Sequence, residues 1–418
     1  MWKIPRGQFT RDVGTQLVTQ GIMFGISLAS GAITARWLGQ EGKGLLGLAT
    51  LLPSFLTLVL GAGLTSANVY FASSGRLSIR TLSSNSAATA IVVTLLGTGL
   101  SLVFMVTGLI AKVVPNCSVK LILIGLFLLP STMFAAQMSS LLQGLRRINT
   151  ISVISTAGQV VNLGLLAFFI VYLRLGVTGA LIAAVLTAFL TLVLDTHAVL
   201  KEGGALRPRY DWAVLKATLG YGIRSHVANL LQYFNYRLDV FVVNFFMGPA
   251  EVGVYGVSVA LAETLWYLPN AVGFVIFPKS AATAALEMNA FTPRVFKYVL
   301  ALTAVGGFVL AIVAKPLIPL VFSKAFNASY VPLLVILPGV VLLGAAKVLT
   351  NEIAGRGHPE YNSINSGICL VITVVTDLLL IPAHGATGAA AASTLAYAAT
   401  LLIALWFYRK VSRMATKA

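Results

Sequence analysis

Three basic side chains interrupt apolar stretches that are otherwise long enough to cross a membrane: Arg224, Arg237 and Lys347. An unpaired charge at the centre of a bilayer costs about 2.5 kcal/mol or more, so it indicates a function or an ion pair. Arginine suits phosphate because its planar guanidinium donates two parallel hydrogen bonds and stays charged. We predict that these residues attract a phosphate-bearing headgroup. The alternatives are structural ion pairs for the arginines, and a Lys347 side chain that reaches along its helix to the membrane surface.

Three acidic residues also fall inside apolar stretches: Asp239, Glu263 and Asp377. A carboxylate at this depth can take up H⁺ or Na⁺ in a coupled transport cycle. It can equally form a salt bridge that holds helices together. We therefore expect these residues to act in ion coupling or as salt-bridge partners.

One stretch, residues 214–246, carries polar side chains spaced by four, three and four residues, which places them on one face of a helix. These residues are Ser225, Asn229, Gln232 and Tyr236. A milder polar face in residues 15–36 contains Gln16, Gln20 and Ser27. Unpaired polar groups are costly in lipid, so we predict that both faces line a central water-filled cavity. The alternative is hydrogen bonding between packed helices.

The elements that must position these residues are predicted from composition. Of 418 residues, 58% are hydrophobic and 10% are charged, against roughly 25% charged in a soluble domain. Apolar runs of roughly 20 residues span a bilayer as helices, and they lack the alternation of a membrane β-barrel. We predict an all-α integral membrane protein of about twelve transmembrane helices. The expected spans are 15–36, 44–72, 86–110, 120–142, 149–172, 178–200, 214–246, 251–277, 296–320, 329–352, 362–382 and 386–408.

The chain contains an internal repeat. Gly39, Gly44 and Gly47 recur 209 residues later as Gly248, Gly253 and Gly256, and the segment 176–180 recurs at 385–389 with the same offset. Because six spans bring the chain back to the same side, the halves should be related by a pseudo-two-fold axis along the membrane normal, as in transporters. We predict two six-helix lobes, 1–205 and 206–418, divided at the polar connector 201–212.

The formal net charge of +17 is predicted to reflect membrane orientation rather than nucleic-acid binding. The basic residues lie at the ends of apolar runs instead of on one folded surface. If the N-terminus is cytoplasmic, about 19 of the Lys and Arg residues face the cytoplasm and about 7 face the opposite side. This distribution is the positive-inside pattern. Both termini should therefore be cytoplasmic. The N-terminal apolar stretch is expected to be retained as the first helix rather than removed as a signal peptide.

Enzymatic chemistry is not indicated. The four histidines are scattered without metal-ligand spacing, so no metal site is expected. Nucleophile-elbow, phosphate-loop and dinucleotide glycine motifs are absent from the sequence, which excludes an ATP-driven pump within this chain. We expect no cofactor other than a coupling H⁺ or Na⁺, and no catalytic residue.

Two turns carry a resemblance to a known family. The segment 37–44, Trp-Leu-Gly-Gln-Glu-Gly-Lys-Gly, resembles the turn after the first helix of polysaccharide (O-antigen type) flippases. The segments 237–239 and 248–255 look like the matching turn after their seventh helix, and 262–266 also fits. The family belongs to the superfamily of multidrug, oligosaccharidyl-lipid and polysaccharide exporters. About twelve spans favour this branch over the lipid II flippases, which tend to carry about fourteen.

The resemblance implies a two-lobe flippase in a prokaryotic inner membrane. It implies that an undecaprenyl-diphosphate-linked oligosaccharide moves from the inner to the outer leaflet by alternating access through a cationic cavity. The implied partners are membrane lipids, the lipid-linked oligosaccharide, and a glycan polymerase or export machinery. Three alternatives stay open: a cation-coupled drug extruder of the same fold, a membrane enzyme of glycan assembly, and a non-transporting component of that assembly.

Overall fold

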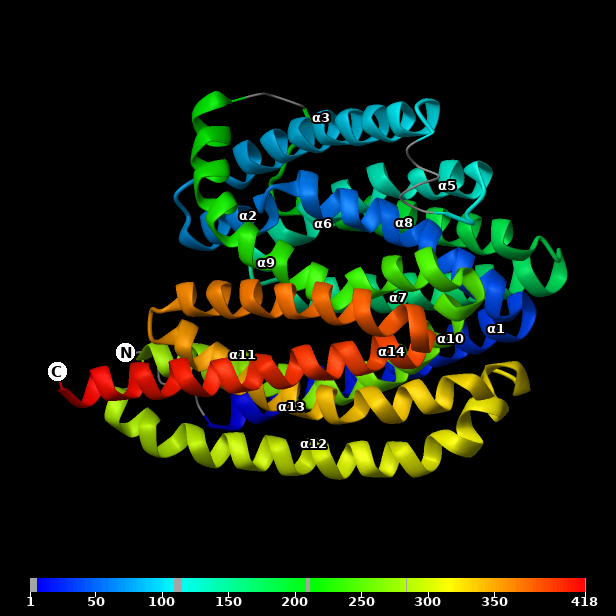
Figure 1. Ribbon diagram of the computed structural model, residues 1–418. Helices are drawn as coiled ribbons and strands as arrows, with labels where there is room; N and C mark the ends of the chain where they lie inside the picture. The colour runs from blue at the N-terminus through cyan, green and yellow to red at the C-terminus, as the bar shows by residue number, and fades with distance from the viewer. Residues whose placement is uncertain (1–5, 109–114, 208–210, 283, 418) are drawn as a thin grey trace. The chain divides into compact units, whose positions relative to one another are not determined.

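The computed structural model describes residues 6–108, 115–207, 211–282 and 284–417. Within these ranges every regular element is a helix (Figure 1). Helices satisfy all their backbone hydrogen bonds internally, which a chain surrounded by lipid requires. The all-α fold predicted from the sequence is confirmed.

The first half of the chain contains α1 (Arg6–Gly61), α2 (Leu64–Ser74), α3 (Ile79–Val106), α5 (Val119–Leu126), α6 (Leu128–Gly144), α7 (Ile148–Leu166), η1 (Ala167–Tyr172) and α8 (Gly176–Lys201). The second half contains α9 (Trp212–Met247), α10 (Pro249–Ala262), η2 (Glu263–Trp266), α11 (Tyr267–Ala282), α12 (Ala285–Val321), η3 (Lys324–Ser329), α13 (Tyr330–Gly355) and α14 (Pro359–Lys417).

The number of spans agrees with the sequence prediction. In the described part of the chain, 9 helical stretches are long and apolar enough to cross a membrane. Two of them, within α1 and α14, are bent at Gly39 and Gly385 and so each hold two predicted spans. The 36-residue helix α9 covers the seventh predicted span. Together these give the predicted total of about twelve.

The internal repeat is present in the backbone as well as in the sequence. Gly39 and its counterpart Gly248 have φ angles of 69° and 85°. Gly176 and its counterpart Gly385 have φ angles of 59° and 54°. Glycine adopts such positive angles without the steric cost of a Cβ atom. Each half therefore turns its chain at the same two places, and the glycines of the repeat are needed for these turns.

Several helices differ in length from the predicted spans. The ninth span was predicted to begin at residue 296, but α12 begins at Ala285, because its polar first turns extend beyond the apolar run. The second span is divided at Gly63, where φ is 71°. The eighth is divided by the short 3-10 turn η2. Hydropathy follows the hydrocarbon region and does not detect such extensions or breaks.

The chain forms two compact units. One comprises Gln16–Leu230, and the other comprises Leu231–Ala418 together with the N-terminal residues as far as Thr15. The division falls inside α9, so the first part of this helix belongs with the N-terminal unit. The lobe boundary between residues 205 and 206 stays a prediction.

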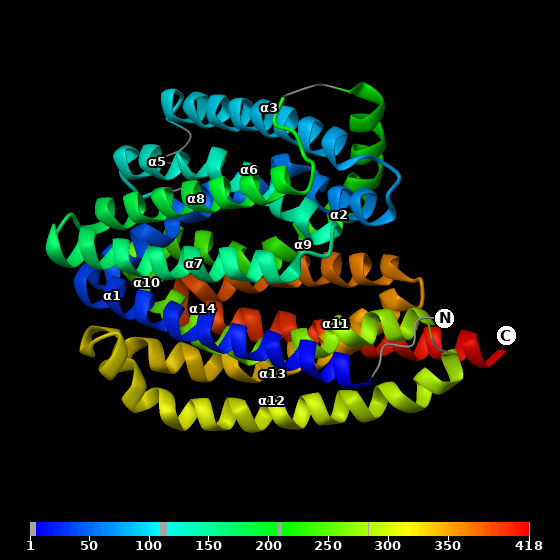
Figure 2. The ribbon, with the colours of Figure 1, turned by 180° about the vertical axis from the view of Figure 1, so that it is seen from behind.

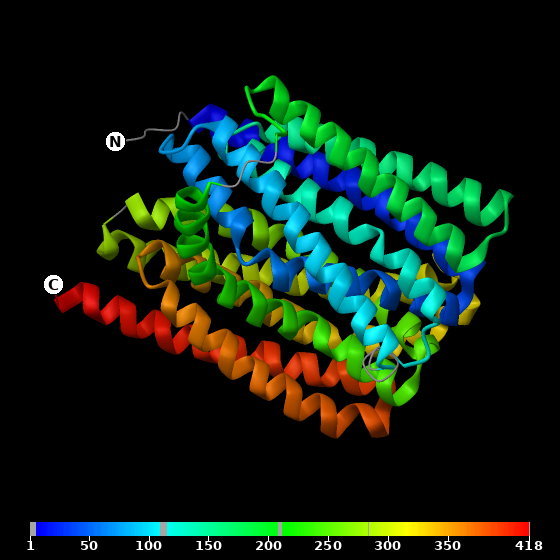
Figure 3. The same ribbon diagram turned by 90° about the horizontal axis from the view of Figure 1, so that it is seen from above.

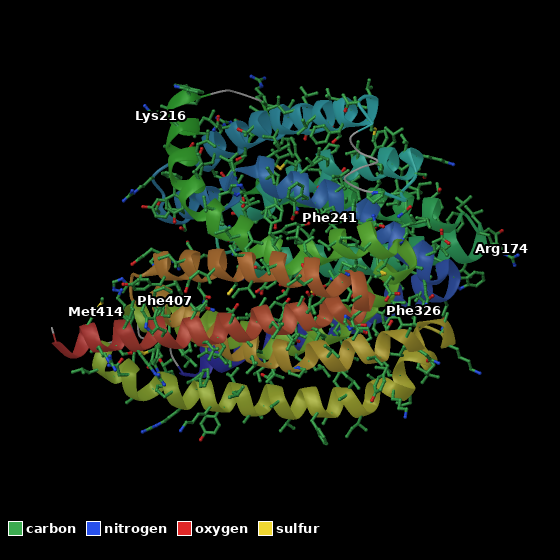
Figure 4. The ribbon with its side chains drawn as sticks, viewed as in Figure 1. Arg174, Lys216, Phe241, Phe326, Phe407 and Met414 are labelled. Atoms are coloured by element: carbon green, nitrogen blue, oxygen red, sulfur yellow. The ribbon has the colours of Figure 1, made fainter. Side chains whose placement is uncertain are left out.

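The N-terminal unit is built around α6, against which α2, α3 and α8 pack. Figures 1 and 2 show α6 among these helices, and Figure 3 shows that the helices run roughly parallel. Its apolar core includes Leu82, Met138 and Leu141, whose side chains are each at most 1% exposed. Tyr221 of α9 stacks on Tyr70 of α2, with ring centroids 4.3 Å apart. Lys216 and Arg174 lie at opposite ends of this unit (Figure 4).

The C-terminal unit is built around α13. This helix lies between α12 and α14 in both views and packs against them and against α11 (Figures 1 and 2). The outward face of α12 carries Val305, Phe308 and Ile312, each more than half exposed. A helix that is apolar on its outward face is typical of a protein in contact with lipid. Phe326 and Phe407 lie at opposite ends of this unit (Figure 4).

Candidate functional site

The C-terminal unit contains a buried carboxylate held by hydroxyl groups. Asp239 of α9 is 3% exposed. Its Oδ2 accepts hydrogen bonds from the Tyr255 hydroxyl of α10 and from the Ser393 hydroxyl of α14, the latter at 3.3 Å. Its Oδ1 accepts one from the backbone N–H of Val240 at 2.8 Å. Three elements therefore orient this carboxylate.

A second buried carboxylate lies near the first. Asp377 of α14 is completely buried, and neither of its oxygens has a hydrogen-bond partner among the described residues. Asp377 and Asp239 are close enough to interact electrostatically. Two ionised carboxylates in a low-dielectric interior repel strongly. Burial and mutual repulsion therefore disfavour the state in which both carboxylates are ionised.

A mixed-charge cluster lies in the same unit. Arg237 forms a two-pronged ion pair with Glu263, with nitrogen–oxygen distances of 3.1 and 3.3 Å. The side chains are 34% and 27% exposed. Two interpretations of Arg237 were predicted, phosphate binding and ion pairing. The structure shows an ion pair, and the partner is Glu263.

Lys347 completes the cluster. Its Nζ donates to Asn270 Oδ1 at 2.9 Å and lies 4.2 Å from the centre of the Trp266 ring. These neutral groups hold the ammonium beside the helix, so the side chain does not extend to a helix end. The Glu263 carboxylate also interacts electrostatically with Lys347. Glu263 thus interacts with both Arg237 and Lys347, and Arg237 also interacts electrostatically with Asp239.

The predicted polar face of α9 is only partly described. Asn229 and Gln232 are exposed, and Tyr236 is half-buried beneath Trp266, with ring centroids 5.3 Å apart. Gln232 donates to the Tyr236 hydroxyl at 3.1 Å. Ser27 of α1 is exposed. The side chains of Gln16, Gln20, Arg224 and Ser225 lie outside the described residues.

Several residues of these clusters were not predicted from the sequence. Tyr255 and Ser393 hold Asp239, while Asn270 and Trp266 hold Lys347. Tyr255 and Trp266 lie in the segments 248–255 and 262–266, which were noted for the family resemblance but not for these contacts. Ser393 and Asn270 had no signal in the sequence, because their partners are on different helices.

No group of three or more His, Cys, Asp or Glu side chains that could hold a metal ion occurs in the part of the chain that the structure describes.

The fold defines a multi-pass helical membrane protein that carries buried charges. The sequence profile of a family described as "Polysaccharide biosynthesis protein" matches residues 33–331, well over half of the chain. The chain belongs to this family, which confirms the resemblance to polysaccharide flippases drawn from its turns.

Individual relatives are more distant. The "Probable low-salt glycan biosynthesis flippase Agl15" of Haloferax volcanii is 23% identical over 199 residues, 45% of this chain and 41% of that protein. The chain thus spans less than half the length of this curated relative.

Solved structures show the same fold. "Lipid II flippase MurJ, inward closed conformation" is 15% identical with a TM-score of 0.75, covering 96% of this chain and 90% of that one. An inward-facing "multidrug resistance MATE family transporter of the MOP superfamily" is 16% identical with a TM-score of 0.73, covering 96% and 99%. The predicted two-lobe membrane fold class is confirmed by this likeness.

Proposed function

We propose that the chain is a flippase that moves an undecaprenyl-diphosphate-linked oligosaccharide from the inner to the outer leaflet by alternating access. Membership of the polysaccharide biosynthesis family and the name of the glycan flippase relative support this proposal. A diphosphate headgroup cannot cross roughly 30 Å of hydrocarbon unaided, because burying unpaired charge is prohibitive. Translocation breaks no bond, so the protein needs no catalytic residue.

The observation that carries the proposal is the Lys347 ammonium, whose close contacts are the neutral Asn270 side chain and the Trp266 ring. A diphosphate bound beside Lys347 would supply the anionic partner. It could also draw Arg237 away from Glu263, because phosphate and carboxylate are both bidentate partners for arginine. Arg224 and the polar residues of α1 and α9 are proposed to contribute to the same path. Their contribution rests on sequence spacing alone.

The acidic pair supports coupling to an ion gradient. If Asp239 and Asp377 release a proton or a monovalent cation in one state and bind it in the other, the gradient drives the cycle. The ion can shift the equilibrium between the two states by no more than the difference between its binding free energies to them.

We further propose that the protein lies in the inner membrane with both termini cytoplasmic, as the distribution of Lys and Arg indicates. A glycan polymerase or export machinery would use the translocated product. The boundary between the two lobes is proposed to lie between residues 205 and 206.

The test is translocation of a fluorescent diphosphate-linked oligosaccharide in proteoliposomes. Lys347→Gln keeps the length and polarity of the side chain but removes its charge. We expect the rate to fall about tenfold or more, since a hydrogen bond to a charged group contributes about 1.5–3 kcal/mol. Lys297→Gln, a matched change at an exposed position of α12, should leave the rate unchanged. Equal rates for both variants would contradict the role of Lys347.

A second candidate is a cation-coupled drug extruder. The buried acidic pair favours it, and the solved transporters of this fold include multidrug exporters. The same proteoliposomes distinguish the candidates. If wild type exports cationic dyes under a Na⁺ or H⁺ gradient and moves no diphosphate lipid, the flippase proposal is wrong.

A further inference from the structure

A groove opens on the surface of the N-terminal unit. α3 and α8 both pack against α6, and the groove lies between them, with a volume of about 460 Å³. Figures 1 and 2 show these three helices side by side. The groove is lined by Ala87, Ile91, Phe134, Leu192, Val193, Thr196, His197, Leu200 and Leu206. Its size falls within the range of small-ligand sites, about 300–1,000 Å³.

The walls of the groove are suited to a hydrocarbon chain. Ile91, Val193 and Leu200 are each between 41% and 46% exposed. Within a bilayer, an acyl chain in the groove packs against these side chains through van der Waals contacts.

One end of the groove is basic. On α3, Arg80 precedes the lining residues Ala87 and Ile91 by seven and eleven positions, which places all three on one helical face. On α8, Lys201 follows Val193 and His197 on the same face by the same spacing rule. Both basic residues are exposed.

The connector after α8 brings a third cation to this end. Ser83 of α3 donates to the Ala205 carbonyl at 3.0 Å, and the Ala205 N–H donates to the Ser83 hydroxyl at 2.8 Å. This pair of hydrogen bonds fixes the connector against the start of α3. Leu206 then lines the groove, and the exposed Arg207 follows it directly.

These cations are not neutralised by nearby acids. Of the acidic residues closest in sequence, Glu202 pairs with Arg147 at 2.8 Å, and Asp211 accepts hydrogen bonds from the backbone N–H groups at the start of α9. Among the described residues, no ion pair involves Arg80, Lys201 or Arg207. The basic end is therefore available for an anion.

We propose that the groove is a binding site for an anionic glycerophospholipid, distinct from the transported substrate. One acyl chain lies against Ile91, Phe134 and Val193. The phosphate lies at the basic end formed by Arg80, Lys201 and Arg207. Charge complementarity at this end selects an anionic lipid over a zwitterionic one. The site goes beyond the proposed transport activity and does not depend on it.

The test is native mass spectrometry of the detergent-solubilised full chain with phosphatidylglycerol or phosphatidylcholine of identical acyl chains. We expect wild type to retain one phosphatidylglycerol in preference to phosphatidylcholine. Ile91→Trp fills the groove and should abolish retention of this lipid. Leu95→Trp is the matched control, because Leu95 is 67% exposed on the same helix but does not line the groove.

Charge variants test the basic end separately. Removing one cation by Arg80→Gln or Arg207→Gln should weaken phosphatidylglycerol binding about fivefold and leave phosphatidylcholine binding unchanged. Lys120→Gln, at an exposed position at the start of α5, should have no effect. If Ile91→Trp unfolds at a lower temperature than wild type, Val193→Trp provides a second groove-filling variant.

Three results would overturn the proposal. The first is equal retention of the two phospholipids by wild type. The second is retention by both groove-filling variants at the level of Leu95→Trp. The third is displacement of phosphatidylglycerol by an equal concentration of a polyprenyl phosphate, which would identify the groove as a site for the carrier lipid.

Discussion

The two units bury polar groups of different kinds. In the N-terminal unit, the Asn68 side-chain amide lies 2.7 Å from Gln137 Oε1 and 3.0 Å from Ser86 Oγ, so the network is neutral. In the C-terminal unit, the carboxylates of Asp239 and Asp377 are buried together. One buried acid, Asp195, does occur in the N-terminal unit, near the end of α8.

Because the two halves are repeats, their buried polar groups can be compared position by position. With the offset of 209, Asp239 corresponds to Ser30 and Asp377 to Phe168, while Asn68 corresponds to Phe277. The halves share their turns but not their buried charges. A neutral network gives the same packing at any ion concentration, whereas an acidic pair responds to protons and cations. We infer that the ion-dependent step belongs to the C-terminal unit.

The prediction with the largest expected effect tests whether buried charges contribute more to stability than buried neutral polar groups do. Glu352 and Arg356 form a buried ion pair on α13, and Arg356 also donates to Asn289 at 2.8 Å. Arg356→Met leaves Glu352 buried without a counter-charge, which should lower the free energy of unfolding by about 3–5 kcal/mol. The measurement is the thermal unfolding midpoint in a fixed detergent.

The matched change in the neutral network is Asn68→Leu, expected to cost about 1–3 kcal/mol. The double variant Glu352→Leu with Arg356→Met removes both charges and should recover most of the lost stability. A larger loss of stability for Asn68→Leu than for Arg356→Met would contradict the proposed difference between the units.

The next effect concerns transport. Asp377→Asn preserves shape but removes one charge of the acidic pair, so gradient-driven translocation should fall by about 100-fold, near the upper range of energetic coupling between sites. The unfolding midpoint should not fall, because a like-charge repulsion is relieved. The measurement is initial translocation rate with and without a Na⁺ or H⁺ gradient.

The control is Asp195→Asn in the N-terminal unit, which should retain the response to the gradient. If Asp195→Asn abolishes the response and Asp377→Asn does not, ion coupling belongs to the N-terminal unit and the comparison is reversed.

The smallest effect concerns the turns that the two halves share. Glu251 Oε1 accepts a hydrogen bond at 3.0 Å from the N–H of Ala386, just after the bend at Gly385. Its counterpart, Gly42, has no side chain, and a Cβ there would lie 3.3 Å from Val177. Glu251→Ala removes the hydrogen bond to Ala386 and should lower the free energy of unfolding by about 1 kcal/mol, as the loss of a helix cap does.

Glu251→Gln keeps an acceptor oxygen and should have nearly the stability of wild type, as judged by the same unfolding measurement. A loss for Glu251→Gln as large as that for Glu251→Ala would show that the negative charge, rather than the hydrogen bond, stabilises this turn.

Much of the fold follows from the sequence. Long apolar runs predicted the helices and their number, because a backbone in lipid must form its hydrogen bonds locally. The glycines at 39, 176, 248 and 385 predicted the repeated turns, because positive φ angles depend on the residue itself. The presence of Arg237, Asp239, Glu263, Lys347 and Asp377 within apolar runs marked the residues of the candidate site.

Only the tertiary structure decided what these residues contact. Asp239 and Asp377 are 138 positions apart, and Lys347 is separated from Trp266 by 81. Hydropathy and helical periodicity describe one helix at a time. They cannot show that Arg237 is paired with Glu263 while Lys347 has only neutral groups in contact. These contacts are set by helix packing, and so the charge of the site, unlike the number of spans, was decided by the folded structure.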